Sequence, residues 1–143
     1  MKDEFEKKVR EYNLEKVVIF LGSQTQEFVR GKMSLSHLFI LTGREDEGMA
    51  ETQGLVVQEA QAMGVPVLVS NQGGMPEGLK EGETGYVISG ENPDSFVDKI
   101  IMLHDDEQLR NSMSANARHF AFSNYGSRDL VQKLITIYKS TLN

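Results

Sequence analysis

Hydrophobic positions along the chain form short continuous runs separated by longer amphipathic stretches. Four runs are rich in aliphatic and β-branched residues, which is typical of strands covered on both faces: 16–21 (KVVIFL), 38–41 (LFIL), 66–70 (PVLVS) and 86–88 (YVI). Helical spacing predicts helices at 2–13, 26–33, 52–63, 105–121 and 127–141, and one more that Pro93 opens. This alternation predicts one α/β domain, residues 1–143, with a Rossmann-like parallel sheet flanked by helices.

The predicted helix 52–63 begins at the edge of the sheet where ligands of this fold class bind, outside the carboxyl ends of the strands. Thr52 is suited to the N-cap position and Gly64 to the position after the last turn. Backbone N–H groups of a first helical turn lack partners within the helix and attract an anion such as phosphate. Here they belong to Thr52, Gln53, Gly54, Leu55 and Val56. The plainer interpretation is that Thr52 only caps the helix and that Gly54 has no role.

Glu59 occupies an unusual place in the same helix. At 100° per residue, four apolar side chains share an arc of roughly 140°. They are Leu55, Val56, Ala60 and Met63. Glu59 projects among them, whereas Gln58 and Gln61 mark the solvent side. Because a buried, unpaired carboxylate costs several kcal/mol, Glu59 is expected to have a partner, either a core arginine or lysine or a ligand.

Glu51 and Glu59 would lie roughly 12 Å apart along a helix that included both. That span suits a molecule whose two phosphates rest on the helix N-terminus and whose hydroxyl-bearing ends reach the two carboxylates, as in a nucleotide-sugar. The alternative for Glu51 is an exposed loop residue that favours the helix dipole.

Composition narrows the chemistry. The chain has 143 residues, 39% hydrophobic and 25% charged, which is typical of one globular domain. It has no cysteine, and its three histidines lack metal-ligand spacing, so no metal site and no cysteine nucleophile are expected. A net charge of -6 without a basic stripe argues against nucleic acid as a partner. No apolar run is long enough to span a membrane, and residues 1–13 are too charged for a signal peptide, so a cytoplasmic location is expected.

Four motifs follow one another between residues 51 and 88. They read ETQGLVVQE at 51–59, AQAMGVPVL at 60–68, GGMPE at 73–77 and GETGYVI at 82–88. This order resembles the donor-binding signature of retaining family-4 glycosyltransferases with the GT-B fold, which begins with two glutamates separated by seven residues. Residues 18–22 (VIFLG) resemble a strand of that family, and residues 122–138 resemble its closing helix. The resemblance covers nearly the whole chain and implies a partial C-terminal domain of a GT-B fold.

The resemblance implies a role for each carboxylate. Glu59 would hold the ribose hydroxyls of the nucleotide, and Glu51, the catalytic candidate, would lie near the transferred sugar. The backbone amides of residues 53–56 would hold the sugar hydroxyls and the diphosphate. Ser23 and Gln24 are candidates for a place near the nucleobase.

The chain also departs from the family pattern. Gln53 stands where phenylalanine is common, and His37, Thr42 and Gly43 replace the usual Asp and Pro-Ser of one strand and its exit. The family's donor domain opens with a strand–helix–strand unit whose Arg and Lys contact the diphosphate. We expect that this unit and the amino-terminal acceptor domain are lacking from these residues.

The implied function is donor binding in a retaining glycosyltransferase, which moves a sugar from a UDP- or GDP-linked donor to a hydroxyl acceptor in polysaccharide or glycolipid synthesis. The expected partners are the nucleotide-sugar and the acceptor domain, with peripheral membrane association through the lacking part. No metal or other cofactor is expected, and the isolated chain is expected to be inactive. Two alternatives remain: a non-catalytic module that binds nucleotides or sugar phosphates, and a GT-B-fold nucleotide-sugar epimerase.

Overall fold

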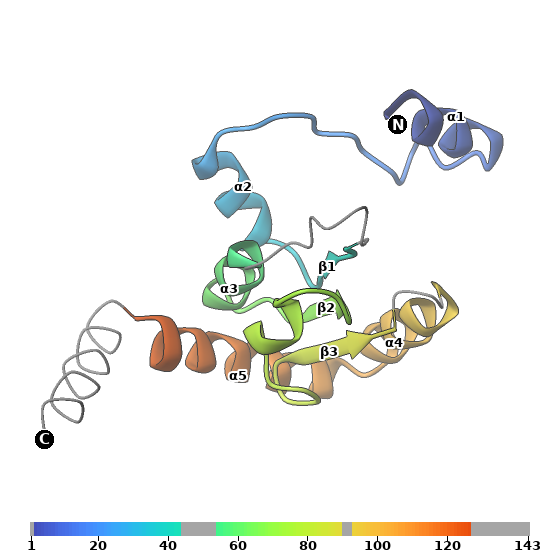
Figure 1. The fold of residues 1–143 in the computed structure, drawn as a ribbon. Helices are drawn as coiled ribbons and strands as arrows, with labels where there is room; N and C mark the ends of the chain where they lie inside the picture. The colour runs from blue at the N-terminus through green and yellow to red at the C-terminus, as the bar shows by residue number, and fades with distance from the viewer. Residues whose placement is uncertain (1, 44–53, 90–92, 127–143) are drawn as a thin grey trace, which may run out of the picture.

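The structure is a computed structural model that describes residues 2–43, 54–89 and 93–126. One parallel sheet contains β1 (Phe39–Leu41), β2 (Val67–Ser70) and β3 (Gly85–Ile88), in that order. The helices of the described residues are α1 (Lys2–Glu11), α2 (Gln26–Met33), α3 (Leu55–Ala62), α4 (Pro93–Asp105) and α5 (Glu107–Tyr125), with a 3-10 helix η1 (Met75–Gly78) (Figure 1). The predicted α/β class, a parallel sheet flanked by helices, is confirmed.

The central strand β2 joins the two halves of the hydrophobic core. Val67 and Val69 pack into a cluster with side chains of α2, α3 and η1, among them Met33, Val57 and Met75. Leu68 lies in a second cluster on the other face, which contains Ile88, Phe96, Leu103 and Met113. Because successive strand residues face opposite sides, a strand covered on both faces has to be apolar throughout, as the sequence of β2 is.

The helices lie near their predicted positions. α4 begins at Pro93, as predicted. α5 begins after Asp106, whose Oδ1 accepts a hydrogen bond from the Leu109 N–H at 2.8 Å, and it continues to Tyr125. Gly64 follows α3 with φ +75°, as expected of a residue that ends a helix. The helix predicted at 127–141 lies outside the described residues.

The strand predicted at residues 16–21 is wrong. Val17 and Ile19 are 72% and 77% exposed, and within the described residues the sheet ends at β1. Figure 1 shows α1 and the segment that follows it lying apart from the sheet. A strand needs a neighbour for its N–H and C=O groups, so strand propensity alone does not make one here.

The predicted buried face of α3 is confirmed at Ala60, which is buried, and at Val56 and Met63, which are partly buried against the core, but it is wrong at Leu55, Glu59 and Gln61. Val57, Ala60 and Gln61 are 0% exposed, whereas Leu55 is 58% exposed and Glu59 is on the exposed side. The Gln61 Nε2 donates a hydrogen bond to the Gly78 carbonyl at 2.6 Å, which joins α3 to η1. A neutral amide can be buried with one such partner, but a carboxylate in its place would need a cation or a proton. The helix is therefore turned so that the glutamine, and not the glutamate, faces the core.

Two substitutions at Gln61 are expected to separate packing from hydrogen bonding. Gln61→Ala should lower the free energy of unfolding by about 2–4 kcal/mol, because it opens a cavity and leaves the Gly78 carbonyl unpaired. Gln61→Met should cost only about 1–2 kcal/mol, because it keeps the volume and removes Oε1, a buried oxygen without a hydrogen-bond partner among the described residues. Urea unfolding of both variants measures the difference. Equal losses would show that packing around Gln61 does not matter.

Candidate functional site

Two strand exits are joined at the carboxyl edge of the sheet. The backbone N–H of Gly43, just after β1, donates to Ser70 Oγ at the end of β2 at 2.7 Å. Met75 of η1, only 1% exposed, packs beneath this edge. A Cβ built at Gly43 would lie 2.6 Å from Met75 Cε, and one at Gly54 would lie 3.4 Å from Met75 Cγ. The thioether therefore lies close to both glycines, which places the start of α3 beside the exits of β1 and β2.

Among the described residues, no side chain caps the amino end of α3. Gly54 occupies the N-cap position and makes no side-chain hydrogen bond, so the prediction of Thr52 as N-cap is wrong. A Cβ at Gly54 would lie 3.0 Å from Val57 Cγ2, so the close packing here also favours glycine. A helix end without a capping side chain offers its first-turn N–H groups and the positive end of its dipole to an anion. Glu51, Thr52 and Gln53, which precede it, lie outside the described residues.

A cavity of about 530 Å³ lies between α2 and the exposed side of α3. Glu59, Ala62 and Met63 contribute the α3 wall. The opposite wall comes from α2 and the loop before it: Gln24, Gln26, Glu27, Val29, Arg30 and Met33. Glu59 lies on the fifth position of α3, roughly 6 Å along the axis from Leu55. The cavity and the helix N-terminus are thus separated by about one helical turn.

Glu59 faces a cavity that a ligand can enter, but it is not the buried residue that the sequence predicts. It is not a buried core residue; it is an exposed wall residue of a concave site. None of the ion pairs of the described residues includes it, so the alternative of a core glutamate paired with a cation is not what the structure shows. An exposed carboxylate in a cavity can accept hydrogen bonds from ligand hydroxyls with little desolvation cost.

Sequence reasoning missed most of the α2 wall. The sequence predicts a place near the nucleobase for Gln24, but it assigns no role to Glu27, Arg30 or Met33. These residues belong to an ordinary amphipathic helix and carry no motif; only the packing of α2 on α3 makes them part of one site. His37 is exposed and lines a second, smaller cavity.

Other chemistry is sparse in the described part of the chain. No group of three or more His, Asp or Glu residues there could hold a metal ion. Nor does any helix found there have the length and apolar character needed to cross a membrane. Burial, and then the Glu77 carboxylate, raise the pKa of Tyr125, but that residue is at the end of α5 and does not line the cavity beside Glu59.

Comparisons with known proteins identify the family. Residues 1–120 match the model of glycosyl transferases group 1. The chain is 33% identical over 134 residues to N-acetyl-alpha-D-glucosaminyl L-malate synthase of Bacillus anthracis, which covers 94% of this chain and 33% of that protein. It is 32% identical over 107 residues to spore coat protein SA of Bacillus subtilis, covering 74% of this chain and 27% of that protein. The chain belongs to the glycosyl transferases group 1 family.

Solved structures show the same fold. The C-terminal domain of the glycosyl transferase group 1 family protein LpcC from Francisella tularensis matches with a TM-score of 0.74 and 26% identity, over 87% of this chain and 62% of that one. Anabaena Alr3699/HepE in complex with UDP matches with a TM-score of 0.81 and 22% identity, over 96% of this chain and 36% of that one. These neighbours are GT-B glycosyltransferases. The chain spans about a third of the length of the Bacillus anthracis relative.

Proposed function

We propose that these residues form the nucleotide-sugar-binding part of a retaining glycosyltransferase. The observation that carries the proposal is the position of the amino end of α3, which no side chain of the described residues caps. It lies about one helical turn from a cavity that Glu59 lines. The family supports the same function, because Alr3699/HepE, which shares the fold, was crystallised with UDP and with UDP-glucose.

The diphosphate of the donor would rest against the first-turn N–H groups of Leu55 and Val56, with Gly54 leaving room for close approach. Glu59 would accept hydrogen bonds from the ribose hydroxyls, since a carboxylate is a strong acceptor. The base would enter the cavity toward Gln24 and α2. The transferred sugar would then point the other way, toward Glu51, Thr52 and Gln53.

This arrangement supplies electrostatic catalysis. When the sugar leaves its phosphate, negative charge develops on the departing nucleotide. The helix N-terminus stabilises that charge without reorganisation, because its N–H groups already point at it. No step in this scheme requires a metal ion. Retention, a place in polysaccharide or glycolipid synthesis and a cytoplasmic location are parts of the same proposal, as is dependence on an acceptor domain outside these residues.

Nucleotide binding is tested by calorimetry on the 143-residue chain. Titration with UDP, GDP, UDP-glucose and GDP-mannose should give 1:1 binding to the nucleotides of one base. Uridine or guanosine without phosphates should bind at least about tenfold more weakly, because they lose the charge-assisted hydrogen bonds at α3. Binding that does not depend on the phosphates, or no binding to any of the four, would contradict the proposal.

The isolated chain should bind donor without transferring sugar. Transfer needs an acceptor held within attack distance of the donor, and the described residues supply only the donor side. Assays with radiolabelled donor and simple glycoside acceptors should show no turnover above the rate without protein. Turnover near one per second, a usual rate for enzymes, would show that no further domain is needed.

A further inference from the structure

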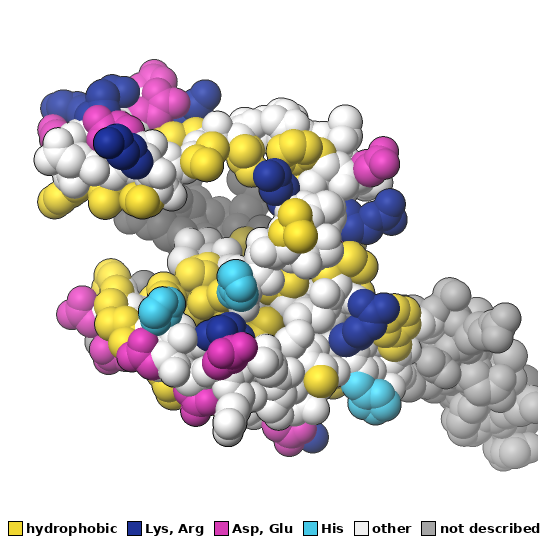
Figure 2. All heavy atoms as spheres, turned by 180° about the vertical axis from the view of Figure 1, so that it is seen from behind, with side chains coloured by type: hydrophobic (Ala, Val, Ile, Leu, Met, Phe, Trp, Pro, Cys, Tyr) yellow, Lys and Arg dark blue, Asp and Glu magenta, His cyan; other side chains and the backbone are white. Residues whose placement is uncertain are grey.

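Met75 contacts both backbone segments that border the proposed phosphate site. Although hydrophobic side chains reach the surface on the face shown in Figure 2, Met75 is only 1% exposed. A Cβ at Gly43 would lie 2.6 Å from Met75 Cε, closer than real Cβ atoms come to another atom, and one at Gly54 would lie 3.4 Å from Met75 Cγ. The methyl end of the thioether therefore fills the space that a side chain at residue 43 would need, and the base of the side chain lies against Gly54.

The backbone that carries Met75 is fixed by hydrogen bonds. η1 begins at Met75, and its Gly78 carbonyl accepts the bond from Gln61 Nε2 of α3 at 2.6 Å. The Met75 N–H donates to the Gln72 carbonyl at 3.3 Å. The Met75 side chain also belongs to the buried cluster on the α3 face of the sheet. Because η1 is bonded both to α3 and to the turn after β2, it cannot move away without breaking these contacts.

Gly43 is fixed on its other side. Its N–H donates to Ser70 Oγ at 2.7 Å, and Ser70 is 0% exposed. The exit of β1 is thus bonded to the end of β2, and the Met75 side chain lies between Gly43 and the start of α3. Because packed atoms resist approach closer than about 3.5 Å, the length of this one side chain sets how far Gly54 lies from Gly43.

We propose that Met75 is a positioning residue of the donor site: its thioether holds the start of α3 at a fixed distance from the exit of β1, and so directs the first-turn N–H groups at the diphosphate. The inference rests on the proposed function, because that function assigns the phosphates to these groups. N–H···O bonds weaken steeply below an angle of about 120°, so a small displacement of Gly54 changes phosphate binding while the fold remains. Met75 itself touches no ligand atom in this scheme.

Leucine at residue 75 distinguishes this role from general packing. Leucine and methionine have similar volumes, and an exchange between them in a core usually costs little stability. The branches of leucine end where the methionine sulfur lies, so the space of the methyl group beside Gly43 would be vacated. Met75→Leu should therefore keep the fold and remove the contact that holds the two segments apart.

Gly43→Ala is the reciprocal change and tests the same spacing with Met75 in place. Gly43 is not among the described glycines with positive φ, so its backbone accepts alanine. The new Cβ would displace the Met75 methyl, which is the end of a flexible side chain and can rotate. When both substitutions are combined, the alanine methyl would occupy the space that leucine leaves. The double variant should then resemble the unmodified chain.

Calorimetry on the 143-residue chain measures these effects. The readout is the affinity for UDP or GDP, whichever binds better, divided by the affinity for its nucleoside, because this ratio isolates the phosphates. Met75→Leu and Gly43→Ala should each lower the ratio at least about fivefold and change nucleoside affinity by less than about twofold. The double variant should have a ratio within about twofold of that of the unmodified chain, because the two changes compensate.

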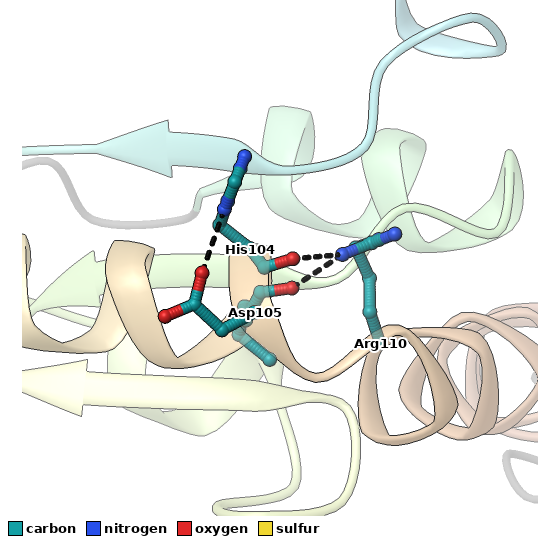
Figure 3. A network of polar contacts seen from close by, with 4 residues as sticks. His104, Asp105 and Arg110 are labelled. Atoms are coloured by element: carbon teal, nitrogen blue, oxygen red, sulfur yellow. Dashed lines mark hydrogen bonds and ion pairs between the residues drawn. The ribbon is translucent and has the colours of Figure 1, made fainter.

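Met113→Leu is the matched control. Met113 is 1% exposed and belongs to the second buried cluster, on the other face of the sheet. It lies in α5, which is joined to α4 where Arg110 Nη1 donates to the carbonyls of Leu103 at 2.6 Å and His104 at 3.0 Å (Figure 3). Like Met75→Leu, this exchange should lower the melting temperature by less than about 5 °C, but it should leave the ratio unchanged.

The outcomes separate this proposal from the proposed function. A ratio near one in the unmodified chain would contradict the proposed function, and with it the role of Met75. A phosphate-dependent ratio that both single substitutions leave unchanged, or that falls further in the double variant, would contradict only the role of Met75. An equal loss in Met113→Leu would show that the ratio follows general core packing, and would overturn the proposal as well.

Discussion

Replacing Glu59 with alanine should weaken nucleotide binding about 10- to 100-fold and leave the fold intact. A hydrogen bond to a charged group contributes about 1.5–3 kcal/mol, and each 1.4 kcal/mol is a factor of ten in affinity. Because Glu59 is exposed on the wall of the cavity, its removal should change the free energy of unfolding by less than about 0.5 kcal/mol. Calorimetry with UDP or GDP, combined with urea unfolding, measures both quantities.

Two further variants serve as controls. Glu59→Gln keeps an acceptor oxygen and loses the charge, so it should weaken binding only about fivefold. Gln58→Ala, one residue away on α3 but not part of the cavity lining, should bind as well as the unmodified chain. If Glu59→Ala bound nucleotide with unchanged affinity, the ribose would have to lie elsewhere.

Of the glycine-to-alanine substitutions in the described part of the chain, Gly85→Ala should lower the free energy of unfolding most. A Cβ at Gly85 would lie 2.0 Å from the carbonyl oxygen and 2.9 Å from the carbonyl carbon of Val67. These are backbone atoms of the strand paired with β3, so neither can rotate away as a side chain would. β2 and β3 would have to separate, and we expect a loss of at least about 3 kcal/mol in the free energy of unfolding.

The matched control is Gly31→Ala in α2. Apart from its chain neighbours and the nearby backbone of its own helix, nothing lies within 4 Å of a Cβ built there, and the residue is inside a helix. Alanine should therefore raise stability by about 0.5–1 kcal/mol, through better helix propensity. Urea unfolding should give opposite signs for the two glycines. Equal, small effects would mean that β2 and β3 can separate at little cost.

The buried strands could be predicted from the sequence because both of their faces are covered by other residues. Residues 67–70 are covered on both faces, so every position is apolar or small and no choice of face is needed. The proline at the start of α4 and the glycine after α3 could also be predicted to lie at helix ends. The backbone conformation at a helix end depends on the local residue type, which the sequence gives. Residues 16–21 are rich in β-branched and other apolar residues, as β2 is, but they have no neighbouring strand among the described residues. Strand propensity depends on the segment alone and cannot predict whether a partner strand is present.

The orientation of α3 could not be read from its sequence. A hydrophobic arc assumes that apolar residues point inward, yet Leu55 is 58% exposed and Gln61 is 0% exposed. What decides the rotation is a carbonyl, that of Gly78, which is 17 residues further along the chain and needs a donor. The importance of Glu59 was inferred from a burial that the structure does not show; what supports its role now is the cavity that it lines.

The cavity itself was also beyond sequence reasoning. Its α2 wall depends on how two helices pack, and no spacing between Arg30 and Glu59 signals that they share one site. The start of α3 was predicted more accurately than the cavity, because a glycine and the free N–H groups of a first helical turn are local features of the sequence. Even there, the N-cap position moved from Thr52 to Gly54.

The most direct measurement of the central claim is an NMR titration of the ¹⁵N-labelled chain with UDP and with GDP. Phosphates at the amino end of α3 and a ribose at Glu59 predict the largest amide shifts at Gly54, Leu55 and Val56, with smaller shifts at Glu59 and Gln24. Uridine or guanosine should leave the first three nearly unchanged. Saturable shifts confined to other surfaces, with residues 54–59 unaffected by either nucleotide, would contradict a donor site at this helix.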